Sequence, residues 1–153
     1  MNDHHEIHKQ EYAMRLAVML SLISLFYFTG AAAQAAEPAA DPKQLTVAVE
    51  KLLAAYNKDD AKAFFVDWAK SVEAIARPET YDALYKNAVK KELGDYQPNT
   101  LALRKEGSVL TGEFLVVYFE GKFAKDVPGL ISVNFQHETG GYKFLQVQLS
   151  KKP

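Results

Sequence analysis

The chain has 153 residues, with 18 lysines and arginines against 19 aspartates and glutamates, and a net charge of −1 at pH 7. This balance, without basic clusters, argues against binding to nucleic acid or to anionic membrane surfaces. Cysteine is absent, which excludes disulfides and a cysteine for lipid attachment.

Residues 1–35 are predicted to be a secretory signal peptide. The apolar run at residues 16–29 is shorter than the roughly 20 residues that a membrane-spanning helix needs. Small residues at 30–35 are typical of a cleavage site, so we expect cleavage after Ala35, with Ala36 as a near alternative. A retained membrane anchor is the competing interpretation.

Residues 1–13 fit a leader poorly, because three acidic residues lie where a basic region is expected. A start at Met14, followed by Arg15, gives a conventional signal peptide, and we therefore predict Met14 as the true start. The histidines of the extension are then given no metal-binding role. After a linker at residues 36–40, residues 41–153 are predicted to form a single periplasmic or secreted domain.

Three helices are predicted to follow the linker. The first begins at Asp41, an N-cap followed by proline at the first helical position, and ends near Asn57. The second begins at Asp59 and ends before Pro78, and the third runs from Pro78 to Gly94. Their apolar stripes are Leu45, Val49, Leu52, Leu53 and Tyr56, then Phe64, Phe65, Trp68, Val72 and Ile75, and then Tyr81, Leu84, Tyr85, Ala88 and Val89.

Three strands are predicted at residues 113–123, 130–137 and 142–149. In the last two, apolar and polar side chains alternate, and the glycines at 140 and 141 favour a tight hairpin. A two-residue loop would mix polar and apolar side chains on both faces, so we predict a three-residue loop at 139–141. The pairs that this loop predicts are Val133 with Val147, Phe135 with Leu145, and Asn134 with Gln146.

The strand at 113–123 is apolar on both faces and should be covered on both. The second cover could be a partner subunit, a cavity, or residues 100–104 folded over it. Together the elements predict an α+β domain. In it, three N-terminal helices pack on one face of a curved antiparallel sheet of three to four strands.

This order of elements resembles the nuclear transport factor 2-like superfamily, and so do three phrases of the sequence. These are AAYNKDDAKAF at residues 54–64, KKELGDY at 90–96, and GEFLVVYFEGKF through GYKFLQVQL at 112–149. The resemblance covers most of the domain and fits small exported members without an assigned function. It implies a cone-shaped, cystatin-like fold that hosts both enzymes and binding modules.

Enzymes of this superfamily place an acidic residue or a histidine inside the cone. Here the apolar strand faces between residues 130 and 149 carry no Asp or Glu. His137, the only histidine after the leader, could be a general base at the mouth of the cone, or a strand-end histidine half in water. Asp67 beside Trp68 could be an acid with a raised pKa, or a solvated aspartate on a helix face. One histidine by itself predicts no metal site.

Four aromatic side chains are predicted on helix faces that meet the sheet. Converging Tyr and Trp side chains can line a small-molecule pocket, although core packing alone is the alternative. With His137, the predicted ligand-binding residues are Tyr56, Trp68, Tyr81 and Tyr85.

The second sheet face carries uncharged polar side chains, which we name the amide patch: Ser132, Asn134, Gln136, Gln146 and Gln148. Because superfamily members often dimerise through the sheet, the resemblance predicts a homodimer interface at Asn134, Gln136, Gln146 and Gln148. A plain solvated surface is the alternative.

The sequence therefore predicts an exported, non-catalytic binding or accessory module with a small apolar pocket. A small apolar ligand is its expected partner, and neither a cofactor nor a metal is expected. One alternative is an enzyme of the isomerase or dehydratase kind that uses His137 or Asp67. The other is a structural or protein-interaction domain that acts through the sheet face.

Overall fold

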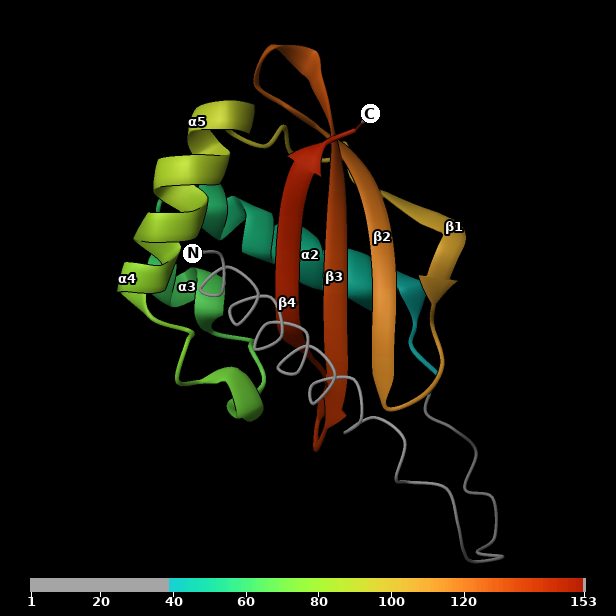
Figure 1. The fold of residues 1–153 in the computed structure, drawn as a ribbon. Helices are drawn as coiled ribbons and strands as arrows, with labels where there is room; N and C mark the ends of the chain where they lie inside the picture. Colours follow the sequence, from blue (N-terminus) through green and yellow to red (C-terminus); the bar gives the residue numbers. More distant parts are fainter. Residues whose placement is uncertain (1–38, 153) are drawn as a thin grey trace, which may run out of the picture. The chain divides into compact units, whose positions relative to one another are not determined.

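The computed structural model describes residues 39–152 of the chain. Its centre is a four-stranded antiparallel sheet in the order β1–β2–β3–β4 (Figure 1). The strands are β1 (Ala102–Val109), β2 (Phe114–Phe123), β3 (Val127–Glu138) and β4 (Gly141–Lys151). With the helices that pack against this sheet, the predicted α+β class is confirmed.

The predicted leader at residues 1–35, and Met14 as its start, lie outside the described residues. The end of the predicted linker is described and pairs with the connection between β1 and β2. Ala39 forms an isolated antiparallel bridge with Thr111, and the Ala40 amide donates to Leu110 O at 3.0 Å. Within residues 39–152, no helix is long and apolar enough to cross a bilayer.

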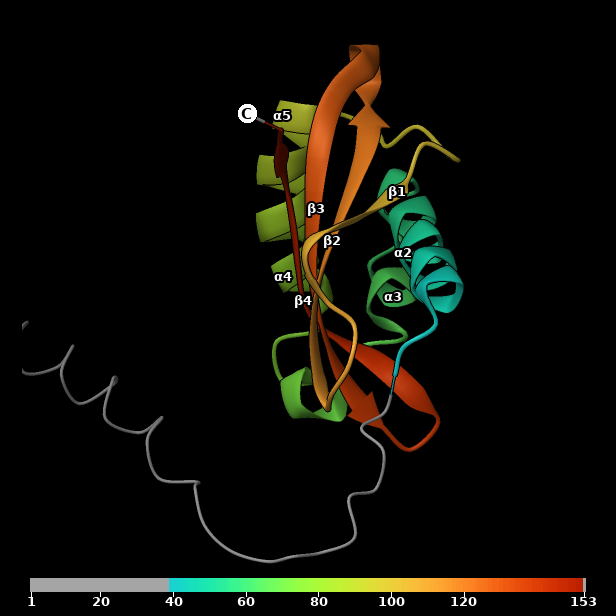
Figure 2. The same cartoon turned by 90° about the vertical axis from the view of Figure 1, so that its right-hand side faces the viewer.

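Helix α2 (Pro42–Asn57) begins and ends as predicted. The Asp41 carboxylate accepts a hydrogen bond from the Lys43 amide at 2.9 Å, and Pro42 takes the first helical position. All five residues of its predicted stripe are buried. Figure 2, which views the sheet edge-on, shows α2 and α3 (Ala61–Phe65) on the same side of the sheet.

The predicted second helix is much shorter than expected. After α3 ends at Phe65, residues 67–69 run beside β4, and a 3₁₀ turn, η2 (Lys70–Val72), follows. The Phe144 amide donates to Asp67 O at 3.1 Å, and the Ala69 amide donates to Phe144 O at 2.8 Å. These two bonds satisfy backbone groups at the free edge of β4, which a continuing helix could not do.

The third helix is continuous from Pro78 to the turn at Gly94, as predicted. It comprises α4 (Pro78–Tyr81), the π-helical η3 (Asp82–Val89) and α5 (Lys90–Leu93). The wider π turns keep Tyr81 and Tyr85 on the buried side, whereas Leu84, predicted to be buried, is 55% exposed. The helix lies along the outer edge of β4 (Figure 1).

The β3–β4 hairpin differs from the prediction at its turn. Its loop has two residues, because Glu138 pairs with Gly141. Farther from the turn, Val133 pairs with Val147 and Asn134 with Gln146, as predicted.

A β-bulge at Leu145 reconciles the two registers. Phe135 pairs with Phe144 instead of the predicted Leu145, and Leu145 is the extra residue. The glycines therefore set a tight turn, while the apolar pattern sets the register beyond the bulge. As a result Phe144, at 3% exposed, joins the core.

The segment at 100–104 does not fold over β2 but leads into β1, which pairs beside β2 as an edge strand. The core lies on the sheet face that α2 and α3 cover. Within the described part of the chain, the other face of β2 stays open: Phe114 is 56% exposed and Val109, on β1, is 50% exposed.

Candidate functional site

The predicted ligand-binding residues separate into two groups. Tyr56, Tyr81 and Tyr85 belong to the packed core and are at most 6% exposed. Their hydroxyls donate to backbone carbonyls at 2.9, 3.0 and 2.8 Å, respectively. None of the three lines the surface hollows described below, whereas Trp68 and His137 each line one.

Phe64 packs against two of these tyrosines. Its ring centroid lies 5.1 Å from that of Tyr81 and 4.5 Å from that of Tyr85. Burial raises the pKa of all three tyrosines above the ordinary value, so their phenols stay protonated at neutral pH. These rings therefore serve packing and hydrogen bonding.

Trp68 lines a surface hollow of about 420 Å³, which we name the Trp68 hollow. Its apolar part includes Phe65, whose ring meets Trp68 edge to face with centroids 4.9 Å apart, and Val66 and Ala76. The lining comes from the turn after α3, from η2 and the residues after it, and from the β3–β4 hairpin. Its volume falls in the range of roughly 300–1,000 Å³ that small-molecule sites have.

The indole Nε1 of Trp68 is buried and has no hydrogen-bond acceptor among the described residues. A buried donor without a partner costs about 1–3 kcal/mol. Because this nitrogen is buried, Trp68 lines the hollow with other atoms than its N–H group.

Four charged side chains also line the Trp68 hollow, two from each wall. Lys70 and Glu73 come from η2 and the residue after it, and Glu138 and Lys143 come from the hairpin. The Lys70 amide donates to Glu138 Oε1 at 3.1 Å, which joins the two walls. The four charges cancel, so the hollow favours neither sign as a whole.

Asp67 is paired with two lysines, one of which lines the hollow. Its Oδ2 accepts a hydrogen bond from Lys51 Nζ at 2.8 Å, and its Oδ1 lies 3.4 Å from Lys143 Nζ. The hydrogen bond from Lys51 is the main cause that holds the pKa of Asp67 below its ordinary value. The raised pKa considered for this carboxyl is therefore wrong.

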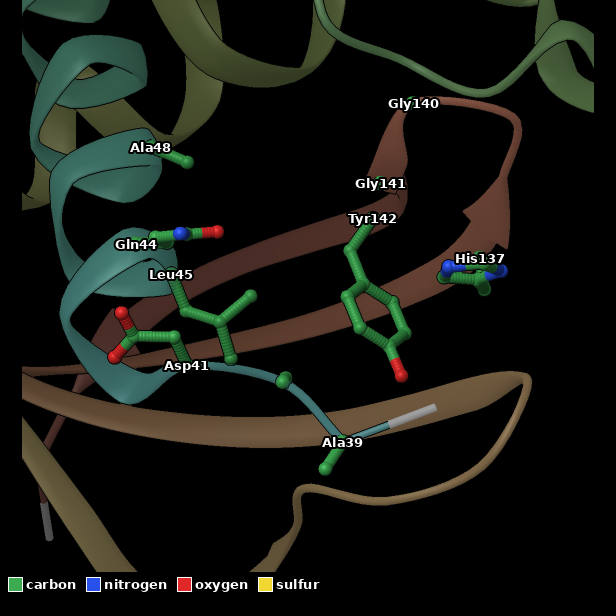
Figure 3. A pocket seen from close by; sticks show the side chains of 10 residues that line it. Ala39, Asp41, Gln44, Leu45, Ala48, His137, Gly140, Gly141 and Tyr142 are labelled. Atoms are coloured by element: carbon green, nitrogen blue, oxygen red, sulfur yellow. The ribbon is translucent and has the colours of Figure 1, made fainter. Parts of the chain in front are cut away.

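His137 lies at a second hollow, of about 320 Å³, between the hairpin and the start of α2 (Figure 3). It pairs with Tyr142 across the strands, with ring centroids 5.1 Å apart, and not with Lys143 as the predicted register implies. In Figure 3, Tyr142 lies between His137 on one side and Asp41, the N-cap of α2, and Gln44 on the other. The Asp41 carboxylate already caps α2.

The structure does not bring the two candidate acid–base residues together. His137 lines the second hollow, whereas Asp67 pairs with Lys51 and Lys143. Over residues 39–152, no carboxylate hydrogen-bonds to the His137 side chain. In the same residues, no group of three or more His, Cys, Asp or Glu side chains is arranged to hold a metal ion.

The predicted interface residues lie on the open face of the sheet. Asn134 Nδ2 donates to Gln146 Oε1 at 3.1 Å, Ser71 Oγ donates to Gln136 Oε1 at 2.9 Å, and Gln148 is exposed. Pairing across β2 and β3 places Phe114 opposite Gln136 and Val116 opposite Asn134. The amide patch therefore continues into an exposed apolar area over β1 and β2.

No sequence pattern predicts the charged lining of the Trp68 hollow. Lys70 and Glu138 are brought together only because residues 67–69 pair with the edge of β4, which is a tertiary contact. Two sequence features lie at this site: the single tryptophan with a lysine two residues later, and a hairpin end with charges of both signs. Neither pattern is specific.

No family model matches the chain, and no curated protein matches its sequence. The resemblance to the nuclear transport factor 2-like superfamily therefore stays a prediction.

Proposed function

We propose that this protein is an exported, non-catalytic binding module whose ligand site is the Trp68 hollow. The observation that supports this most is the aromatic lining: Trp68 and Phe65, whose ring centroids lie 4.9 Å apart, both line a hollow of about 420 Å³. Apolar and charged groups from distant parts of the chain converge on the same hollow, as they do in small-molecule sites. The lowered pKa of Asp67 supports a binding role over a role as a general acid.

The single tryptophan of the chain provides the test, because it lines the hollow and is the chain's one source of tryptophan fluorescence. The purified protein is titrated with benzoate, benzylamine, octanoate and phenylalanine, under excitation selective for tryptophan. We expect at least one probe to shift the Trp68 emission saturably at or below about 10 mM, as a weak specific site would.

Two alanine variants make the test specific to the hollow. Ala76 lines it, whereas Ala74 is exposed and is not among its lining residues. Ala76→Phe should fill the space and abolish the saturable response, and Ala74→Phe should leave it unchanged. If no probe acts, or if both variants respond equally, the hollow is not the binding site.

A homodimer through the sheet is a second candidate, favoured by the open face of β2. Phe114 and Val109 are each at least half exposed beside the uncharged amide patch. In a two-fold interface, Asn134→Lys would place two unpaired charges near the axis and dissociate the dimer. Asn87→Lys, on the exposed side of η3, is the matched control.

Sedimentation of the wild type and both variants at equal concentrations reads this out. We expect a dimer for the wild type and Asn87→Lys, and a monomer for Asn134→Lys. A wild type that sediments as a monomer at every concentration would exclude this interface.

A further inference from the structure

The Trp68 hollow carries charges of both signs on each wall. Lys70 and Glu73 lie on one wall, and Glu138 and Lys143 on the other. Among the described residues, only Lys143 of these four has a side-chain ion pair, with Asp67 at 3.4 Å. The side-chain charges of Lys70 and Glu73 are therefore available to a ligand, and Glu138 keeps one oxygen beyond the one that accepts from the Lys70 amide.

A ligand with a single sign of charge fits this lining poorly. An anion would lie near Glu73 and Glu138, and a cation near Lys70 and Lys143, and in both cases like charges would face each other. A neutral apolar molecule would remove water from all four charges without replacing its hydrogen bonds. A zwitterion carries a negative group that can pair with the lysines of the lining and a positive group that can pair with the glutamates.

The apolar part of the hollow indicates what else the ligand carries. The Phe65 and Trp68 rings, with their centroids 4.9 Å apart, provide an aromatic surface for an apolar side chain. A volume of about 420 Å³ suits a molecule of amino-acid size.

We infer that the Trp68 hollow binds a free α-amino acid with an apolar or aromatic side chain. Its carboxylate lies toward Lys70 and Lys143, and its ammonium group lies toward Glu73 and Glu138. This inference rests on the proposed binding function of the same hollow and specifies its ligand class.

Three ligands that share one side chain test the zwitterion requirement. L-Phenylalanine has both charges, N-acetyl-L-phenylalanine lacks the ammonium group, and L-phenylalaninamide lacks the carboxylate. Each is titrated against the wild-type protein by Trp68 fluorescence. Because each derivative leaves charges of one sign without a partner, we expect both to bind at least about tenfold more weakly than phenylalanine.

Variants of the charged lining residues then show which protein charge contacts which charged group of the ligand. Glu73→Gln should weaken phenylalanine binding by about threefold or more. It should also reduce the difference in affinity between phenylalanine and N-acetyl-phenylalanine, because the variant lacks a carboxylate that attracts the ammonium group. Lys70→Gln should likewise weaken phenylalanine binding and reduce the difference in affinity between phenylalanine and phenylalaninamide. Both side chains are exposed, so these variants are expected to fold, and Lys62→Gln, an exposed lysine outside the hollow, is the control.

The outcomes separate this inference from the proposed function. Equal binding of the three ligands, or binding of benzoate, benzylamine or octanoate without binding of phenylalanine, overturns the amino-acid inference and leaves the binding site standing. No response to any probe overturns both. If the affinity differences between phenylalanine and its two derivatives are the same in Glu73→Gln and Lys70→Gln as in the wild type, the assignment of the charges is overturned.

Discussion

Gly129→Ala is expected to test how tightly the aromatic core packs against β2 and β3. Gly129 lies opposite Gly121 in the sheet. A Cβ atom at position 129 would fall 2.5 Å from Phe123 Cδ2 and closer still to Cε2, which is far inside van der Waals contact. Phe123 is fully buried, and the rings of Tyr56 and Tyr96 lie 6.4 and 5.8 Å from it, centroid to centroid.

The expected magnitude follows from two opposing effects. Overpacking a core costs about 1–3 kcal/mol. Replacing glycine by alanine reduces the conformational entropy of the unfolded chain, which raises the free energy of unfolding by about 0.4–1 kcal/mol where alanine can adopt the backbone conformation without strain. We therefore expect Gly129→Ala to lower the free energy of unfolding by about 1–2 kcal/mol.

Gly121→Ala is the matched control in the neighbouring strand. There the added Cβ would lie 3.0 Å from Tyr96 Cε2 and 3.4 Å from Ile131 Cδ1, which is tight but allows a small adjustment. We expect its free energy of unfolding to stay within about 1 kcal/mol of the wild type.

Urea titrations followed by circular dichroism and by Trp68 fluorescence measure both variants. If Gly129→Ala is as stable as the wild type, or if the two variants lose equal stability, the Phe123 ring has room to move and this account of the core is incorrect.

Three further predictions concern single hydrogen bonds and one titration. Tyr85→Phe removes the hydroxyl that donates to Val147 O and should lower the free energy of unfolding, measured in urea, by about 1–2 kcal/mol. A variant as stable as the wild type would contradict this prediction. Asp41→Ala should cost about 1 kcal/mol through the lost N-cap; a larger loss than for Tyr85→Phe would indicate further contacts at Asp41. For Asp67 the folded pKa is below the unfolded value of about 3.9, so the unfolded chain binds more protons in acid. The stability advantage of the wild type over Asp67→Asn should therefore be present at neutral pH and shrink as the pH falls below about 4. Urea midpoints that differ equally at every pH would contradict it.

The sequence by itself determined the elements whose signals are local. Asp41 and Pro42 define the start of α2, because an N-cap and a proline act within one helical turn. Pro78 and Gly94 bound the third helix for the same reason, and alternating side chains define β3 and β4. The α+β class follows from these elements together.

Only the tertiary structure decided where the second helix ends and where the candidate site forms. Residues 67–69 leave the helix because their backbone groups pair with Phe144 at the edge of β4, and no local pattern records that pairing. The bulge at Leu145 likewise depends on the competition between a tight turn and an apolar face. The Trp68 hollow is the product of both: edge pairing and the bulged hairpin bring Lys70 beside Glu138 and Trp68 beside Lys143, residues that are far apart along the chain.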